Sequence, residues 1–336
     1  MKILVTGGAG FIGSNFIRHI LTTERDVSVV NFDKLTYAGN LENLRDVEND
    51  SRYTFVKGDI ADAAAVDAVM KGVDAVVNYA AETHVDRSIM DPKAFLATDI
   101  MGTWTLLEAV RRHNIPRMIQ ISTDEVFGEI MEGEADEQAP FRPRSPYAAA
   151  KAGGDLLCAA FHETYKTPVI VTHACNIYGP YHYPEKLIPL AITNLLEGKP
   201  VPLYGDGSQI REWMHVSDHC RAIAEVLRRG KSGEVYNIGT GERISNLELL
   251  QRIAAILGKD ESAIHRVADR PGHDRRYALS HQKVSSELGW KPSKTLAEGL
   301  PETVAWYREH ESWWRPLKSG EYLEYYRKQY KVRDAA

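Results

Sequence analysis

The sequence contains little of what would build a membrane-embedded, disulfide-bonded or metal-bound protein. Its three cysteines are Cys158, Cys175 and Cys220, and no Cys-x-x-Cys pair is present, so neither a disulfide framework nor a zinc site is expected. No segment approaches the ~18 consecutive apolar residues of a membrane span. The first apolar run gives way to glycines too early for a signal peptide. We therefore expect a cytoplasmic protein with no metal and no membrane contact.

Positive charge is not in excess either. The chain has 41 Lys and Arg against 46 Asp and Glu, a net charge of −5. A general nucleic-acid-binding protein needs a basic surface, so that class is not expected. With 336 residues, 43% of them hydrophobic and 26% charged, the composition is that of a globular protein with a large core.

The first half alternates short apolar runs with segments of helical spacing, which is typical of β-α-β units. Because such crossovers are right-handed, the pattern predicts an α/β fold with a Rossmann-like, doubly wound parallel sheet. Strands are predicted at residues 2–6, 27–32, 53–56, 74–79, 117–122 and 169–172, and helices at residues 11–21, 61–70, 95–113 and 147–165.

The amino-acid composition changes near residue 175, where proline and glycine become frequent and the predicted helices and strands become shorter. We predict a Rossmann domain over residues 1–175 and a smaller, mixed α/β substrate-binding domain over residues 176–336. One segment of the second half is expected to return to the sheet. The Tyr- and Trp-rich tail, residues 306–330, is predicted to pack on the body as helix.

A glycine-rich turn, residues 7–13 (Gly-Gly-Ala-Gly-Phe-Ile-Gly), lies between the first predicted strand and helix. Its glycines permit a tight turn whose backbone N–H groups reach a pyrophosphate at the helix N-terminus. Asp33 follows the second strand, where a carboxylate accepts from ribose hydroxyls and favours NAD over NADP. Asp59 follows the third strand, at the edge where an adenine would lie, although an ordinary turn fits its spacing equally well. The turn residues predicted to bind cofactor are Gly7, Gly10, Phe11, Ile12 and Gly13.

Tyr147 and Lys151 are four residues apart and share one face of a predicted helix. Tyrosine is a poor base at its ordinary pKa of about 10. A neighbouring ammonium and the positive nicotinamide of NAD favour the phenolate, which makes Tyr147 a candidate base for alcohol oxidation. From the spacing alone, a surface pair remains an alternative.

Thr123, Asp124 and Glu125 follow another predicted strand. Ligands of open α/β sheets bind at the carboxyl ends of strands. Two adjacent carboxyl groups there are a candidate acid–base pair, because different surroundings move their pKa values apart. A solvated turn is the alternative at this point.

These motifs together resemble the extended short-chain dehydrogenase/reductase superfamily. The segment Ser-Thr-Asp-Glu-Val-Phe-Gly, residues 122–128, is similar to a narrower family, the dTDP-glucose 4,6-dehydratases. Further segments resemble the same family in the same order along the chain: residues 33–40, 82–88, 178–190, 209–213 and 270–277.

The resemblance implies a reaction that converts a nucleotide-linked glucose to its 4-keto-6-deoxy form. Tyr147 would remove the C4 hydroxyl proton while hydride passes to a tightly held, regenerated NAD. Lys151 would support Tyr147, and Thr123 would orient the C4 oxygen. Glu125 would take the C5 proton, and Asp124 would protonate the departing C6 hydroxyl. The resemblance also implies a homodimer formed through paired helices, near residues 95–113 and 147–165, and a role in deoxysugar biosynthesis such as that of rhamnose.

Further site residues follow from the resemblance alone. Besides the turn residues, those implied to bind NAD are Asp33, Lys34, Thr36, Asp59, Ile60, Ala80, Ala81, Thr83, Thr98, Tyr147 and Lys151. Those implied to bind the nucleotide sugar are His84, Thr123, Asn176, Lys186, Leu187, Pro202, Tyr204, Arg211, Asn246, Arg270 and His273. Lys186, Arg211 and Arg270 suit a diphosphate.

The chain departs from the resembled pattern at several positions. Cys175 and Ile177 stand where the family commonly has Ser and Asn, and Phe127 replaces a common Tyr. Asp99 stands where Asn is usual. These departures leave the nucleotide preference open, so a UDP-glucose 4,6-dehydratase remains an alternative. A nucleotide-sugar epimerase and a catalytically silent NAD-binding scaffold are further alternatives, against which the Asp124–Glu125 pair and the retained Tyr147 and Lys151 respectively argue.

Overall fold

The computed structural model describes residues 1–331 and contains a seven-stranded sheet in which every neighbouring pair is parallel. The strand order is β10-β6-β5-β4-β1-β2-β3, so the predicted doubly wound α/β sheet is confirmed. The strands are β1 (Lys2–Thr6), β2 (Ser28–Asp33), β3 (Tyr53–Lys57), β4 (Ala75–Asn78), β5 (Met118–Thr123), β6 (Val169–Ala174) and β10 (Val235–Ile238).

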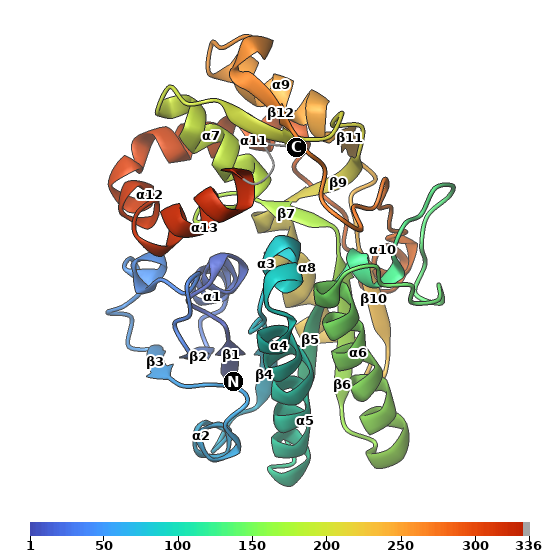
Figure 1. The fold of residues 1–336 in the computed structure, drawn as a ribbon. Helices are drawn as coiled ribbons and strands as arrows, with labels where there is room; N and C mark the ends of the chain where they lie inside the picture. Colours follow the sequence, from blue (N-terminus) through green and yellow to red (C-terminus); the bar gives the residue numbers. More distant parts are fainter. Residues whose placement is uncertain (332–336) are drawn as a thin grey trace.

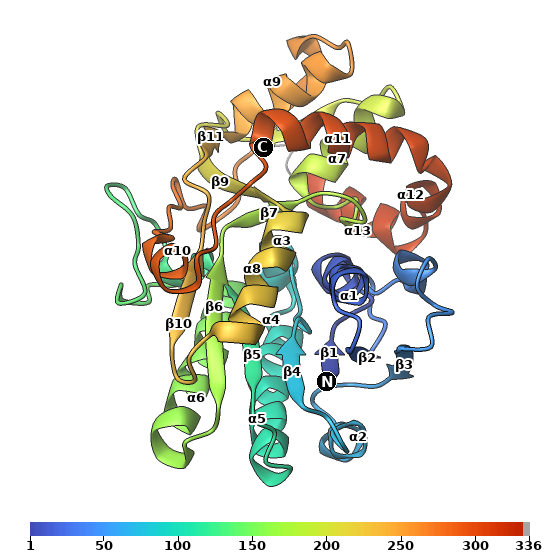
Figure 2. The ribbon, with the colours of Figure 1, turned by 180° about the vertical axis from the view of Figure 1, so that it is seen from behind.

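Both faces of this sheet are covered by helices, and successive strand residues serve opposite faces. Ile3 and Val5 of β1 belong to one buried cluster, and Leu4 between them belongs to another. The first cluster lies against α1 (Phe11–Thr23), α8 (Val216–Arg229) and α10 (Gln282–Leu288). The second lies against α2 (Ala63–Val69), α5 (Thr103–Arg112) and α6 (Pro146–Tyr165). The opposite views of Figures 1 and 2 show the two helical layers.

The helix predicted over residues 95–113 is interrupted. It comprises α4 (Pro92–Phe95), a π-helical segment η2 (Leu96–Gly102) and α5, and it is preceded by an unpredicted helix α3 (Val85–Met90). Asp91 caps α4 by accepting from the Lys93 backbone N–H, and Pro92 opens that helix. Single π-helical turns inside helices often mark functional sites.

The second half forms a separate layered cluster above the carboxyl ends of the sheet (Figure 1). Its strands are β7 (Asn176–Tyr178), β9 (Ile210–His215) and β11 (Arg243–Ser245) in one sheet, with β8 (Val201–Tyr204) and β12 (Ile264–Val267) in another. Its buried cluster includes residues of α7 (Leu187–Leu196), α9 (Asn246–Ile256) and α11 (Leu296–Glu309). The 3-10 helices within residues 1–331 are η1 (Leu41–Leu44), η3 (Asp124–Phe127) and η4 (Glu261–Ala263).

The second half also supplies β10, which pairs with β6 at the edge of the main sheet. The boundary predicted at residue 175 stays a prediction, and residues 332–336 of the predicted second domain lie outside the described residues. Across residues 1–331, no helix combines the length and apolar character needed to span a membrane.

The tail packs on the body as helix, but in three pieces: α11, α12 (Glu311–Leu317) and α13 (Glu321–Lys331). Trp314 is fully buried, and its indole N–H donates to the Tyr307 carbonyl at 2.7 Å. Trp313 donates to the Asn43 side chain at 2.9 Å, which ties the tail to the first half of the chain.

Candidate active site

A cavity of about 430 Å³ lies where the carboxyl ends of the sheet strands meet the second half of the chain. This is the place at which open α/β sheets bind ligands. Every residue that the sequence predicted for cofactor, catalysis or substrate lines this one cavity. The structure therefore brings all three predicted sets together around one cavity.

The glycine-rich turn connects β1 to α1, and its glycine positions leave little or no space for a side chain. Gly7 has a φ of +66°, and a Cβ on Gly13 would lie 2.5 Å from the Gly7 carbonyl oxygen. A Cβ on Gly10 would meet the same oxygen at 3.2 Å. The turn therefore leaves backbone exposed at the N-terminus of α1, a cradle that fits the pyrophosphate of a dinucleotide.

Asp33 ends β2 beside this turn. Its carboxylate accepts from the backbone N–H groups of Ala9 at 2.9 Å and Leu35 at 2.7 Å. Burial raises the pKa of Asp33, and these two hydrogen bonds oppose that rise. Farther along the same edge, Lys34 pairs with Asp59 at 2.7 Å. The carboxylates predicted from strand spacing thus sit at the edge of the cradle.

Thr123 ends β5, and Asp124 and Glu125 begin the short helix η3. The Thr123 hydroxyl donates to Asp124 Oδ1 at 3.2 Å, and Asp124 Oδ2 is buried without a hydrogen-bond partner among the described residues. Burial, then the charges of Glu125 and Glu212, raise the pKa of Asp124 well above its usual range. These effects favour the neutral, protonated form of Asp124.

Glu125 lies in a different electrostatic environment from Asp124. Burial raises its pKa as well, but the positive charges of Arg270, Arg211 and Lys186 oppose that rise. The pKa values of two adjacent carboxyl groups are thus moved by different neighbours, which is the condition for one to donate a proton and the other to accept one.

Tyr147 and Lys151 lie on α6 and both line the cavity. The Lys151 ammonium donates to the Ile121 carbonyl at 2.7 Å and lies 3.8 Å from a carboxylate oxygen of Asp99. Burial, followed by the charges of Glu125 and Asp99, raises the pKa of Tyr147 well above its usual range. Burial and these carboxylates oppose ionisation of the phenol, so the expectation that Lys151 and the positive nicotinamide favour the phenolate stays a prediction.

The wall formed by the second half is basic. Lys186 donates to the Thr83 hydroxyl at 3.0 Å, and the Arg211 guanidinium lies 4.2 Å from the centre of the Tyr277 ring. Asn176 Oδ1, Asn246 Oδ1 and Arg270 Nε are buried without hydrogen-bond partners among residues 1–331. Cationic groups and unsatisfied polar atoms around one cavity suit a polar, anionic ligand.

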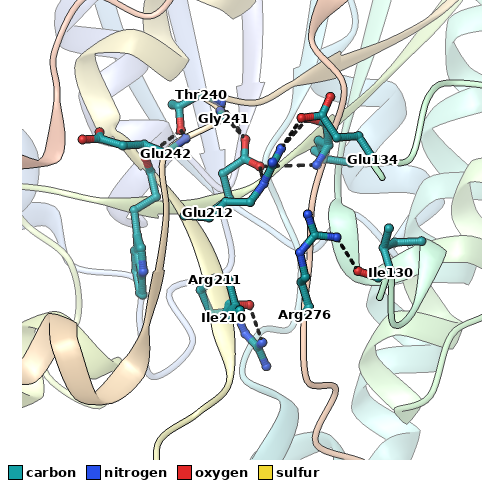
Figure 3. A network of polar contacts seen from close by, with 12 residues as sticks. Ile130, Glu134, Ile210, Arg211, Glu212, Thr240, Gly241, Glu242 and Arg276 are labelled. Atoms are coloured by element: carbon teal, nitrogen blue, oxygen red, sulfur yellow. Dashed lines mark hydrogen bonds and ion pairs between the residues drawn. The ribbon is translucent and has the colours of Figure 1, made fainter. Parts of the chain in front are cut away.

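Glu212 anchors the strand that carries Arg211, and the two side chains extend in different directions (Figure 3). The buried Glu212 carboxylate accepts from the backbone N–H groups of Thr240 at 2.6 Å and Gly241 at 3.0 Å. It also pairs with Arg243 at 2.8 Å, and Arg243 pairs in turn with Glu134. These contacts fix β9 and so hold Arg211 at the cavity.

Sequence reasoning missed Tyr330, which the tail brings to the cavity, and a group of side chains from the tail and α3 that surrounds the lining residue His84. The Tyr325 hydroxyl lies 3.2 Å from His84 Nδ1, and the Arg87 guanidinium lies between the rings of Tyr37 and Tyr325, 3.6 and 4.4 Å from their centres. Tyr330 lines the cavity and stacks on Tyr204. The only signal was the helical spacing of tyrosines in residues 322–330.

Residues 4–303 match the protein family described as GDP-mannose 4,6 dehydratase. The chain belongs to this family. The resemblance stated from the sequence is thereby confirmed at the level of the nucleotide-sugar dehydratases and their Rossmann-like relatives.

Within this family, the chain is similar to proteins named dTDP-glucose 4,6-dehydratase. It is 53% identical over 323 residues to the one from Streptomyces niveus, covering 95% of this chain and 96% of that protein. The crystal structure of the Streptomyces venezuelae enzyme of that name, which has NAD bound, superposes with a TM-score of 0.93 at 51% identity, over 95% of this chain and 100% of the other. A UDP-glucuronic acid 4-epimerase from Bacillus cereus, in complex with UDP-glucuronic acid and NAD, superposes with a TM-score of 0.87 at 30% identity, over 92% and 99% of the two chains.

The glycine-rich turn gives a prediction that separates folding from ligand binding. In Gly13→Ala the new Cβ meets backbone at 2.5 Å, whereas in Gly10→Ala it meets the same oxygen at 3.2 Å. We expect Gly13→Ala to lower the thermal melting temperature of the protein without added ligand, by several degrees. Gly10→Ala should keep that temperature nearly unchanged but weaken NAD binding at least about tenfold, because the backbone can no longer approach the pyrophosphate. Equal melting temperatures for the two variants would contradict this assignment.

Proposed function

We propose that the chain is an enzyme, a hydro-lyase that uses NAD to dehydrate dTDP-glucose to dTDP-4-keto-6-deoxyglucose. One observation carries this proposal: the Asp124–Glu125 pair lies in the same cavity as Tyr147, Lys151 and the glycine-rich turn. A redox site and an acid–base pair that share one substrate cavity fit an oxidation followed by elimination of water. The names and ligands of the similar proteins support the same substrate and cofactor.

The residues fit NAD through the glycine cradle at α1 and the carboxylate of Asp33. NAD, when bound, supplies a hydride acceptor at C4 of the sugar and a hydride donor at C6, so it is regenerated in each turnover and has no need to leave. Lys34, Thr36, Asp59, Ile60, Ala80, Ala81, Thr83 and Thr98 complete the proposed cofactor wall, together with the turn residues.

Tyr147 is proposed to remove the proton of the C4 hydroxyl group. Its phenolate is unfavourable in the protein alone, because burial and two carboxylates raise its pKa. The positive charge of a nicotinamide ring in the same cavity would offset those carboxylates. The Tyr147 phenolate would then be favoured when the oxidised cofactor is bound. Thr123 is placed to orient the C4 oxygen, and Lys151 to hold a ribose while contributing its charge to the phenolate.

Glu125 is proposed to take the proton from C5, which the C4 ketone has made acidic. The three cationic groups around Glu125 favour its charged, accepting form. Asp124, held protonated by burial and by Glu125 and Glu212, donates to the C6 hydroxyl group as it leaves as water. After the return of hydride to C6, Glu125 gives its proton back to C5.

The nucleotide part of the substrate is assigned to the basic wall. Lys186, Arg211 and Arg270 face its diphosphate, and Tyr204 borders the base. The remaining proposed substrate contacts are His84, Asn176, Leu187, Pro202, Asn246 and His273. Because the fold is shared with 4-epimerases, the fold alone does not decide the reaction. The acid–base pair favours dehydration, since epimerisation at C4 needs no elimination.

The first test follows the substrate. Purified protein without added NAD is incubated with dTDP-glucose and UDP-glucose in parallel, and products are followed by mass spectrometry and proton NMR. We expect loss of one water and a new C6 methyl signal from dTDP-glucose, with a preference over UDP-glucose of about 10-fold, since one methyl group in an apolar pocket contributes ~1–3 kcal/mol. Comparable rates would move the assignment to a broader nucleotide specificity. If neither sugar loses water even with added NAD, the proposal fails.

A second test separates the two carboxyl groups. Asp124→Asn keeps the shape but cannot protonate the leaving hydroxyl, so the dehydration rate should fall about 10²–10⁴-fold. Exchange of the C5 proton with deuterated solvent should persist in this variant because Glu125 is intact. In Glu125→Gln, both dehydration and C5 exchange should be lost. The opposite pattern, with exchange lost only in Asp124→Asn, would reverse the two roles.

We further propose that the protein is a homodimer of the cytoplasm that serves deoxysugar biosynthesis, for example of rhamnose. Exposed apolar side chains occur on α3, η2, α5 and α6, which pack against one another on one side of the sheet: Ile89, Met90, Leu96, Met101, Trp104 and Leu156. Such a face suits a second copy of the chain. The three cysteines are free and buried, as expected in a reducing compartment.

The dimer can be tested at Leu156, whose side chain on α6 is 61% exposed. Leu156→Asp should convert the dimer to a monomer in light scattering coupled to size-exclusion chromatography, because the charge would have to be desolvated at the interface. Met131→Asp, a substitution at a 58% exposed side chain in a loop, serves as the matched control and should leave the mass unchanged. A wild-type protein that already elutes as a monomer would refute the proposal.

A further inference from the structure

Asp99 is a buried carboxylate next to the lysine of the active site. It is 1% exposed, and one of its oxygens lies 3.8 Å from the Lys151 ammonium, which is itself 4% exposed. Neither Asp99 oxygen has a partner within normal hydrogen-bond geometry in residues 1–331, although the Glu82 backbone N–H lies close enough to favour the carboxylate. A buried carboxylate with so little hydrogen bonding is costly, and an opposite charge at short range offsets part of that cost. Asp99 and Lys151 therefore depend on each other.

The backbone holds this pair in place. Asp99 lies in the π-helical segment η2, and its carbonyl accepts from the Thr103 hydroxyl at 2.7 Å. Gly154 of α6 packs so closely that a Cβ there would lie 2.7 Å from the same carbonyl oxygen. Lys151 lies about one helical turn before Gly154. Close packing of α6 on η2 thus sets the separation between the two charged groups.

We propose that Asp99 is a positioning residue that acts through Lys151. Its carboxyl group is a titratable counter-charge, and its ionisation determines how strongly the Lys151 charge stabilises the Tyr147 phenolate. The inference rests on the proposed function, since it assumes that Tyr147 is the base. Asp99 is not assigned any contact with substrate or cofactor.

The surroundings of Asp99 place its titration near neutrality. Burial raises the pKa of Asp99 to about 7, against the charge of Lys151, which lowers it. The other facing charges are the side chains of Glu82, in the segment after β4, and Asp155, one turn beyond Lys151 on α6, and both raise the pKa further, whereas the Glu82 backbone N–H lowers it. The η2 segment itself carries no other ionisable side chain. In turn, the charge of Asp99 raises the pKa of Tyr147.

The direction of the effect follows from these signs. Below pH 7 Asp99 is neutral, and the full charge of Lys151 favours the Tyr147 phenolate. As the pH rises through 7, Asp99 ionises and pushes the pKa of Tyr147 upward. Ionisation of Asp99 therefore disfavours ionisation of Tyr147. As a result, activity should rise with pH less steeply than it would for a single base.

The test is the pH profile of Asp99→Asn, a substitution that keeps shape and removes the charge. We expect the ascending limb of kcat to move about one pH unit lower and to steepen to a single-group titration, with little change in KM. A residue with only a structural role would lower kcat at every pH and leave the limb where it was. An unmoved limb would overturn the proposal.

Infrared difference spectroscopy gives a readout that needs no turnover. The wild-type protein should show the carbonyl band of a protonated carboxyl group that disappears near pH 7, and the band should be missing in Asp99→Asn and, as a second variant, in Asp99→Ser. The matched control is Asp155→Asn, which removes another buried carboxylate of the same region. This variant should keep the band, but the band should disappear at a slightly lower pH than in wild type. Absence of the band from wild type refutes the inference, whereas a band together with an active Tyr147→Phe variant refutes the proposed function instead.

Discussion

An isolated carboxylate is expensive to bury, and this fold buries several at the carboxyl end of β5. Asp99, Asp124 and Asp155 are each almost inaccessible to water. The cost is offset differently for each: Asp99 lies near Lys151, Asp155 forms hydrogen bonds with Ser122 and His173, and the raised pKa of Asp124 favours its neutral form. Each of these arrangements requires particular neighbours at fixed positions. The electrostatics of the site therefore depend on how α6, the end of β5 and the strand β9 pack together.

Much of this arrangement was accessible from the sequence, because local chemistry encodes it. The glycine-rich turn, the carboxylate that ends β2 and the Thr-Asp-Glu run each depend on residues adjacent in the chain, and all of them line the cavity. The order of strands and helices followed from hydrophobic periodicity.

What the sequence did not predict depends on contacts between distant segments. The π-helical turn of η2 exists within a run that reads as one helix, and its place is fixed by close packing against Gly154. Tyr330 lines the cavity, and Tyr325 contacts His84 beside it, because the buried Trp314 and the Trp313–Asn43 hydrogen bond anchor the tail. The raised pKa of Tyr147 arises first from burial and then from carboxylates on other elements, and neither can be seen in the Tyr–Lys spacing.

The position of β10 affects how the chain can be made. β6 belongs to the first half, but its outer edge is paired only by β10, which is synthesised after the whole of β7 to α8. Until β10 is synthesised, β6 is therefore an open edge of the sheet, and an open edge is a template for pairing with other chains. Productive folding in the cell has to protect that edge until the missing strand emerges, which makes the order of translation part of the physical problem this sequence solves.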